Sequence, residues 1–136
     1  MTRPKTPIAL TIAGSDSGGG AGIQADLKAF SAMGVYGASV LTALTAQNTM
    51  GVTAIHDVPN DFVAAQMDAV YSDLAVAATK IGMLSQTSTI KTVVAGLFRH
   101  DAKQIVLDPV MVTTSGNLLL SRDAVAGLKK ALIPIA

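Results

Sequence analysis

A glycine-dense stretch near the N-terminus constrains this chain more than any other feature. Five of the nine residues 14–22 are glycine. They lie between an apolar run, residues 8–13, that predicts a strand, and Ile23, Leu27 and Phe30, whose spacing predicts a helix. Such strand-to-helix turns bind ligands in α/β proteins, because glycine allows close approach of backbone amides and the helix N-terminus favours an anion or a polar ring. We therefore expect this turn to bind a ligand and Gly20→Val to abolish that binding.

Three other interpretations of the stretch are less consistent with the residues. A Walker phosphate loop requires Lys-Ser or Lys-Thr after its last glycine, whereas Gly19 is followed by Gly20 and Ala21. A dinucleotide-binding G-x-G-x-x-A pattern fits residues 20–25, but the acidic residue that would bind the ribose is absent between Lys28 and Asp57. A turn without a ligand does not explain so many glycines, since each costs about 0.5–1 kcal/mol relative to alanine in regular structure.

Four separated motifs carry a family resemblance. They are TIAGSDSGGGAGIQADLK at 11–28, TALTAQNT at 42–49, KIGML at 80–84, and VLDPVMV at 106–112 followed by Ser115-Gly116. In order and spacing they resemble the hydroxymethylpyrimidine/phosphomethylpyrimidine kinases of thiamine biosynthesis, a branch of the ribokinase-like superfamily. The resemblance covers nearly all 136 residues, but members of that family are considerably longer. The chain therefore resembles the N-terminal portion of a single kinase domain, spanning residues 1–136.

The resemblance implies a fold and an activity. The fold would be α/β, with a ribokinase-like open, mainly parallel sheet, helices on both faces, and truncation after the N-terminal half. The activity would be transfer of the γ-phosphoryl group of ATP, with Mg²⁺, to the hydroxymethyl oxygen of 4-amino-5-hydroxymethyl-2-methylpyrimidine and then to the monophosphate. The family's catalytic base and anion hole would lie outside this portion. No catalytic residue is expected in the chain, which alone should bind the pyrimidine without turnover.

The resemblance also implies site residues. Five would contact the pyrimidine, with Gln47 hydrogen-bonding the ring and the others forming the walls: Gly14, Ala21, Gln47, Met83 and Val110. Asp26 and Asp108 would lie near the phosphates or the metal, and Asp108 is the candidate Mg²⁺ ligand. From the residues alone, a helix-face charge and a strand-end cap remain equally good interpretations of these two acids.

The rest of the chain alternates strand and helix patterns. Strands are predicted at 36–46, 52–58, 77–83 and 104–107, the last being the clearest buried one, and helices begin near residues 60, 87 and 121. Thr87 or Ser88, and Ser121, are the expected helix caps, and residues 113–117 are an expected polar loop. Lys80 lies within a predicted buried strand, so its ammonium must reach an edge, a carboxylate or a ligand, and a structural partner is favoured. The pattern predicts one α/β unit with a mainly parallel sheet.

Composition limits the partners. Only 14% of residues are charged, the net charge is +1 and aromatic residues make up 4%, which argues against nucleic-acid binding. The chain has no cysteine, which suits a cytoplasmic protein, and its N-terminal apolar run is too short to predict a signal peptide or a membrane span. We expect the pyrimidine and ATP as ligands, and a homodimer or a complementary C-terminal half as partner. A pyridoxal or related vitamin-alcohol kinase and a non-catalytic pyrimidine-binding module remain alternatives.

Overall fold

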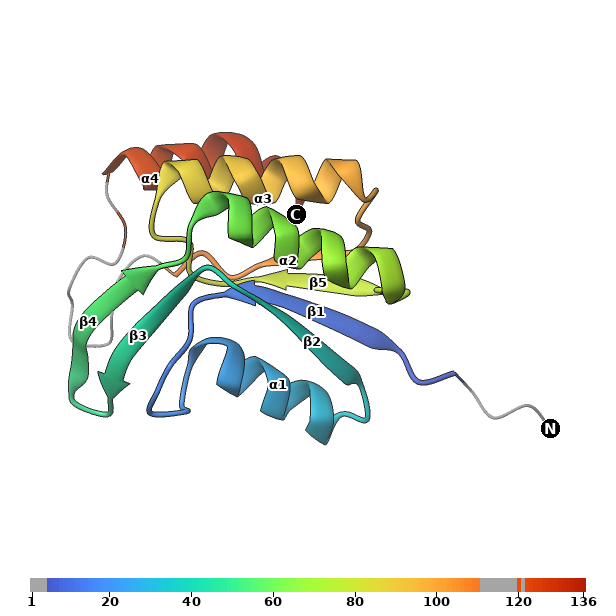
Figure 1. The fold of residues 1–136 in the computed structure, drawn as a ribbon, viewed down its shortest axis with the longest axis horizontal. Coiled ribbons are helices and arrows are strands. Elements are labelled where there is room, and N and C mark those ends of the chain that lie inside the picture. Colours follow the sequence, from blue (N-terminus) through green and yellow to red (C-terminus); the bar gives the residue numbers. More distant parts are fainter. Residues whose placement is uncertain (1–4, 111–119, 121) are drawn as a thin grey trace.

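The computed structural model describes residues 5–110, 120 and 122–136 (Figure 1). Strands and helices alternate along most of the chain, and the last helix continues into a π-helical turn, Leu128–Leu132, and a 3₁₀ turn, Ile133–Ile135. In order, the main elements are β1 Ile8–Ala13, α1 Gly22–Ala32, β2 Tyr36–Leu41, β3 Ala43–Asn48, β4 Gly51–Asp57, α2 Asn60–Asp73, β5 Ala78–Ile81, α3 Thr87–Arg99, β6 Ile105–Leu107 and α4 Arg122–Gly127.

Four of the strands form one parallel sheet in the order β2-β1-β5-β6. Helix α1 covers one face of this sheet, and α2, α3 and α4 lie over the other (Figure 1). The strands β3 and β4 form a separate antiparallel hairpin, which extends beyond the carboxyl end of β2. The predicted α/β fold, an open and mainly parallel sheet with helices on both faces, is confirmed.

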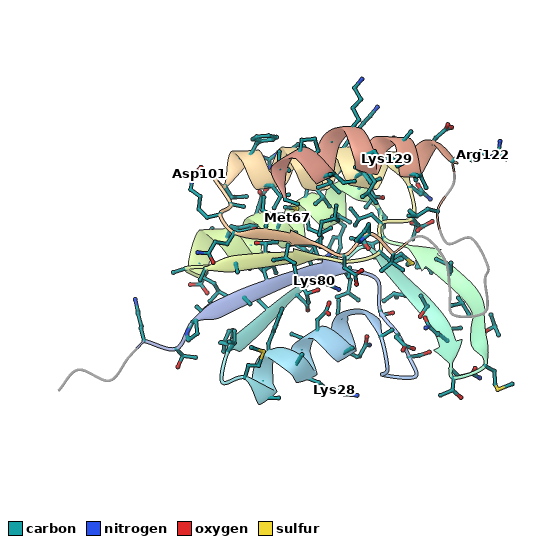
Figure 2. All side chains as sticks on the ribbon, turned by 180° about the vertical axis from the view of Figure 1, so that it is seen from behind. Lys28, Met67, Lys80, Asp101, Arg122 and Lys129 are labelled. Carbon is teal, nitrogen blue, oxygen red and sulfur yellow. The ribbon has the colours of Figure 1, made fainter. Side chains whose placement is uncertain are left out.

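Side-chain alternation along the strands separates the main apolar core from the face covered by α1, which carries small and polar residues. In β1, Leu10 and Ile12 belong to the buried cluster beneath α2 and α3, while Thr11 points to the other side and contacts α1. In β5, Ile81 joins the same cluster and Lys80 points to the α1 side. Figure 2 shows Met67 of α2 directed into the core layer and Lys80 on the opposite side of the sheet. Polar side chains from two neighbouring strands, Thr11 and Lys80, thus meet on the α1 side.

The strand predicted at 36–46 is two strands. β2 ends at Leu41 and β3 begins at Ala43, with Thr42 between them. Its N–H donates to the Ala13 carbonyl at 3.0 Å, and its hydroxyl donates to the Met83 carbonyl at 3.2 Å. The first bond continues the parallel pairing of β1 with β2, and from Ala43 onward the chain pairs with β4 instead.

The prediction that 104–107 is the most buried strand is also wrong. β6 is short and lies at an edge of the sheet, where, among the described residues, it pairs only with β5. Val106 is consequently 59% exposed. An apolar run does not distinguish a central strand from an edge strand, because edge position depends on the neighbours that the fold provides.

Two of the predicted helix caps can be assessed. Neither Thr87 nor Ser88 caps α3: the capping position is Gln86, and its side chain makes no capping hydrogen bond. The buried Thr89 instead donates to Asn60 Oδ1 at 3.0 Å, which joins α3 to the start of α2. Ser121 and the predicted loop 113–117 lie outside the described residues.

Across residues 5–110, 120 and 122–136, no helix combines the length and apolar character needed to cross a membrane.

Candidate ligand-binding site

A cavity of about 310 Å³ opens at the carboxyl ends of β1 and β5. It lies between the glycine-dense turn, the start of α1 and the β3–β4 hairpin, which is the edge where open α/β sheets bind ligands. The seven positions implied by the resemblance come from the turn, α1, β3 and the segments after β5 and β6, and all of them line this cavity: Gly14, Ala21, Asp26, Gln47, Met83, Asp108 and Val110.

Gly22 is the position in the turn where the backbone conformation most clearly requires glycine. This residue has φ +57°, and a β-carbon there would lie 2.5 Å from the Gly14 carbonyl oxygen, which itself accepts a hydrogen bond from Ile23 N–H. At Gly20 a β-carbon would meet only Asp16 Oδ2, at an ordinary 3.8 Å, and φ there is not positive. Among these two positions, the protein itself therefore requires glycine at Gly22 and not at Gly20, and the loss of ligand binding in Gly20→Val stays a prediction.

Asp16 organises the turn from within, a role that sequence reasoning missed. Its side chain is buried, and its carboxylate accepts backbone hydrogen bonds from Gly18 at 2.8 Å, Gly20 at 2.9 Å and Ala21 at 2.8 Å. The amides expected to receive a ligand anion are thus occupied by the chain's own carboxylate. The available signal was an Asp two residues before a glycine, which is typical of an Asx turn.

These contacts lower the pKa of Asp16. Burial alone raises the pKa of its carboxyl group, but the backbone N–H groups of the turn together outweigh that effect and hold the pKa below the ordinary value. The carboxylate is therefore ionised at neutral pH and acts as a fixed internal anion at the start of α1. A phosphate would meet repulsion at this position.

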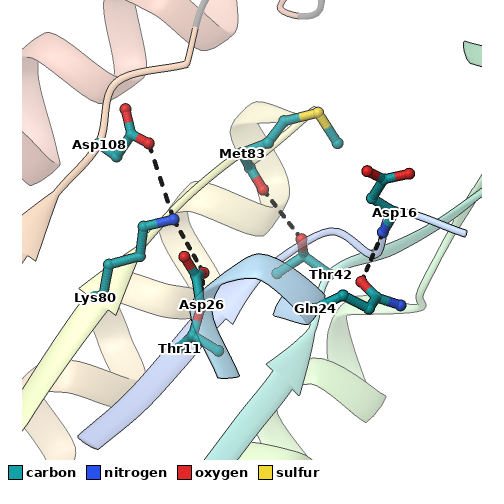
Figure 3. A network of polar contacts seen from close by, with 8 residues as sticks. All are labelled: Thr11, Asp16, Gln24, Asp26, Thr42, Lys80, Met83 and Asp108. Carbon is teal, nitrogen blue, oxygen red and sulfur yellow. Dashed lines mark hydrogen bonds and ion pairs between the residues drawn. The ribbon is translucent and has the colours of Figure 1, made fainter. Parts of the chain in front are cut away.

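On the opposite wall, two residues converge on Asp26. Thr11 and Lys80 are register partners on β1 and β5, and both point toward α1. The Asp26 Oδ2 atom accepts a 2.6 Å hydrogen bond from the Thr11 hydroxyl and a 3.0 Å charged bond from Lys80 Nζ. Figure 3 shows Lys80 between Asp26 and Asp108, whose Oδ2 lies 3.9 Å from the ammonium. A carboxylate is thus the structural partner favoured for Lys80.

The two acids differ in their ability to bind a metal. Asp26 is 16% exposed at its side chain and is already neutralised by Lys80, whereas Asp108 is 57% exposed. Within the described ranges, no group of three or more His, Cys, Asp or Glu side chains could hold a metal ion. Mg²⁺ needs only one or two carboxylates when substrate phosphates supply further ligands. Asp108 fits that requirement and Asp26 does not.

The β3–β4 hairpin is joined to the turn by a second set of bonds. Ser15 N–H donates to the Ala43 carbonyl at 2.9 Å, and Thr45 N–H donates to the Ser15 hydroxyl at 3.0 Å. The Ser17 hydroxyl accepts from Gln47 N–H at 2.7 Å and donates to the Gln47 carbonyl at 2.6 Å. The turn therefore follows β3 almost as a third strand, and the backbone of Gln47 is fixed at the rim of the cavity.

Comparison with known proteins places these features in a family. A family model described as phosphomethylpyrimidine kinase matches residues 16–136. A hydroxymethylpyrimidine/phosphomethylpyrimidine kinase from Rhizobium meliloti (strain 1021) is 66% identical over 131 residues, which are 96% of this chain and 49% of that protein. The chain spans about half the length of the curated kinases of that name that it matches.

Solved structures agree. The crystal structure of phosphomethylpyrimidine kinase from Clostridium difficile 630 aligns with a TM-score of 0.92 and 51% identity, over 96% of this chain and 57% of that one. Pyridoxal kinase from Staphylococcus aureus in complex with pyridoxal aligns with a TM-score of 0.85 and 32% identity, over 98% of this chain and 49% of that one. The fold is therefore ribokinase-like, and the chain belongs to the phosphomethylpyrimidine kinase family.

Proposed function

We propose that this chain forms the pyrimidine-binding part of a hydroxymethylpyrimidine/phosphomethylpyrimidine kinase. The observation that carries the proposal is the position of Gln47 at the rim of a cavity whose walls include Gly14, Ala21, Met83 and Val110. A primary amide offers both a donor and an acceptor, which match the ring nitrogen and amino group of an aminopyrimidine. The small and apolar walls suit the faces of a flat ring.

For the complete kinase we propose ATP-dependent phosphorylation of 4-amino-5-hydroxymethyl-2-methylpyrimidine and then of its monophosphate. The name of the Rhizobium meliloti relative supports both substrates. Asp108 would hold Mg²⁺, which supplies neutralisation of the charge that develops on the phosphate oxygens. Lys80 keeps Asp26 in place through their 3.0 Å ion pair and presents positive charge to the cavity. These residues would orient the hydroxymethyl group and its phosphate, while Gln47 fixes the ring.

Two further proposals concern an alternative ligand for the cavity and a partner for the chain. The likeness to pyridoxal kinases supports pyridoxal as the second candidate for the same cavity. The exposed edge strand β6 supports our expectation of a homodimer or a complementary C-terminal half, because an unpaired edge favours pairing with another strand. A non-catalytic pyrimidine-binding module would show pyrimidine binding without turnover in the complete protein.

Replacing Gln47 by alanine should weaken pyrimidine binding selectively. Loss of one partner in a buried hydrogen-bonded pair costs about 1–3 kcal/mol, which corresponds to about a 10- to 100-fold increase in the dissociation constant. Isothermal calorimetry with 4-amino-5-hydroxymethyl-2-methylpyrimidine measures this change. Gln86→Ala is the matched control, because that amide bonds Asp57 at 2.6 Å and does not line the cavity. Unchanged affinity in a folded Gln47→Ala variant would exclude Gln47 as the ring-binding residue.

A further inference from the structure

The Thr45 hydroxyl makes two contacts that one proton does not satisfy. Its Oγ1 atom lies 2.8 Å from the Ser15 carbonyl oxygen and 3.3 Å from the Oε1 position of the Gln47 amide. Carbonyl oxygens only accept hydrogen bonds, so each contact would require the hydroxyl to donate. A threonine hydroxyl carries a single proton and donates fully to one partner. One of the two contacts must therefore be of another kind.

The shorter contact retains the proton. Among the described residues, no backbone N–H donates to the Ser15 carbonyl, and a 2.8 Å separation is the ordinary length of a hydroxyl-to-carbonyl bond. The Thr45 oxygen then turns a lone pair toward Gln47, which an amide oxygen would repel. The oxygen and nitrogen of a glutamine side chain have the same shape, and hydrogen-bond partners decide which one occupies which position. Exchanging them by a 180° rotation lets Nε2 donate to Thr45.

We propose that Thr45 holds the Gln47 amide in one orientation, with Nε2 toward Thr45 and Oε1 toward the cavity. The position of the Thr45 side chain is fixed, because the residue is bonded to Ser15 through both its N–H, at 3.0 Å, and its hydroxyl. The backbone of Gln47 is fixed by Ser17. With both backbones fixed, the contact with Thr45 sets the direction of the Gln47 amide.

This orientation of the amide favours one hydrogen-bonding pattern on the edge of the ligand ring over the reverse pattern. The inference about the ligand rests on the proposed function. With Oε1 directed to the cavity, the amide accepts from an exocyclic amino group and its second N–H can donate to the adjacent ring nitrogen. A 4-oxo ring presents the reverse order, with an acceptor at the exocyclic position and a donor at ring N3, so it would suit the rotated amide. Thr45 is therefore a specificity-determining residue that favours amino- over oxopyrimidines.

Thr45→Val tests this assignment, since valine has the same shape but no hydroxyl. Calorimetry would compare 4-amino-5-hydroxymethyl-2-methylpyrimidine with its 4-oxo analogue. We expect the wild-type chain to prefer the amino compound, and Thr45→Val to reduce that preference by about 10-fold, as loss of one neutral hydrogen bond implies. Thr45→Ser should restore the preference. Thr53→Val is the control, because the Thr53 hydroxyl bonds Ala46 O at 3.0 Å on the same hairpin without lining the cavity.

A measurement without ligand checks the orientation itself. In nitrogen-15-labelled wild-type chain, a nuclear Overhauser effect is expected between a Gln47 side-chain amide proton and the β-proton of Thr45. Its absence would overturn the inference even if Thr45→Val did not fold. An unchanged amino-to-oxo preference in folded Thr45→Val would also overturn it, while leaving the pyrimidine proposal intact. If the wild-type chain bound neither compound, the proposed function would fail, and with it the selection between ligands; the Overhauser effect would then decide the amide orientation alone.

Discussion

Gly22→Ala will destabilise this chain by about 3 kcal/mol or more. A left-handed backbone costs a non-glycine residue about 1–2 kcal/mol, and φ at Gly22 is +57°. The added β-carbon would also lie 2.5 Å from Gly14 O, 3.0 Å from Ser15 C and 3.1 Å from Asp16 N, all of them backbone atoms that move only with the whole turn. Overpacking of this kind typically adds about 1–3 kcal/mol. Denaturant unfolding followed by circular dichroism measures the loss.

Gly20→Ala is the matched control for that experiment. It lies two residues away in the same turn, where a β-carbon meets only one atom, at 3.8 Å. We expect its free energy of unfolding to stay within about 1 kcal/mol of wild type, as surface changes usually do. Equal stability of both variants would mean that the turn does not fold over the Gly14 carbonyl as described, and the cavity wall formed by residues 14–22 would have to be rebuilt.

Asp16→Ala will disorder the turn and weaken ligand binding together. The substitution removes the acceptor of three backbone N–H groups, those of Gly18, Gly20 and Ala21. Hydrogen bonds to a charged group contribute about 1.5–3 kcal/mol each, and water will recover part of this at the exposed turn, so we expect a net loss of about 2–3 kcal/mol. Asp16→Asn keeps one acceptor oxygen and should fall between wild type and Asp16→Ala.

The same residue predicts a pH dependence with a defined sign. The pKa of Asp16 is lowered in the folded chain, so between that pKa and the ordinary value the unfolded state binds more protons. Its contribution to stability is fully present above about pH 4 and is lost as the pH falls through the lowered pKa. Asp16→Ala should therefore lose less stability than wild type between about pH 5 and pH 2. An Asp16→Ala profile parallel to wild type would contradict the role of Asp16.

Periodicity predicted the elements well wherever local pattern and fold agree. The apolar run of β1, the start of α2 at Asn60 and the glycine-dense turn all lie where the sequence pattern placed them. The break at Thr42 was missed because nothing in its neighbours interrupts a strand: the chain changes there from parallel pairing with β1 to antiparallel pairing with β4. Tertiary contacts override propensity at such points.

In the site, too, some residues could be predicted from the sequence and others depend on contacts that only the structure shows. The resemblance gave seven cavity positions, and the residues themselves indicated a ligand at the turn and a partner for Lys80. Asp16 and Thr45 could not be assigned in this way, because spacing does not reveal whether backbone amides bind a ligand or an internal carboxylate. Short polar side chains such as Thr45 also bond many alternative neighbours. Their roles follow only from the distances to Gly18, Ser15 and Gln47.

A calorimetric comparison of two ligands tests the central claim most directly. The claim is that the cavity between the glycine-dense turn and the β3–β4 hairpin recognises an aminopyrimidine through Gln47. Titration of the 136-residue chain with 4-amino-5-hydroxymethyl-2-methylpyrimidine should give saturable binding at one site per chain, tighter than that of pyridoxal measured under the same conditions. Tighter binding of pyridoxal, or pyrimidine binding that Gln47→Ala leaves unchanged, would contradict it.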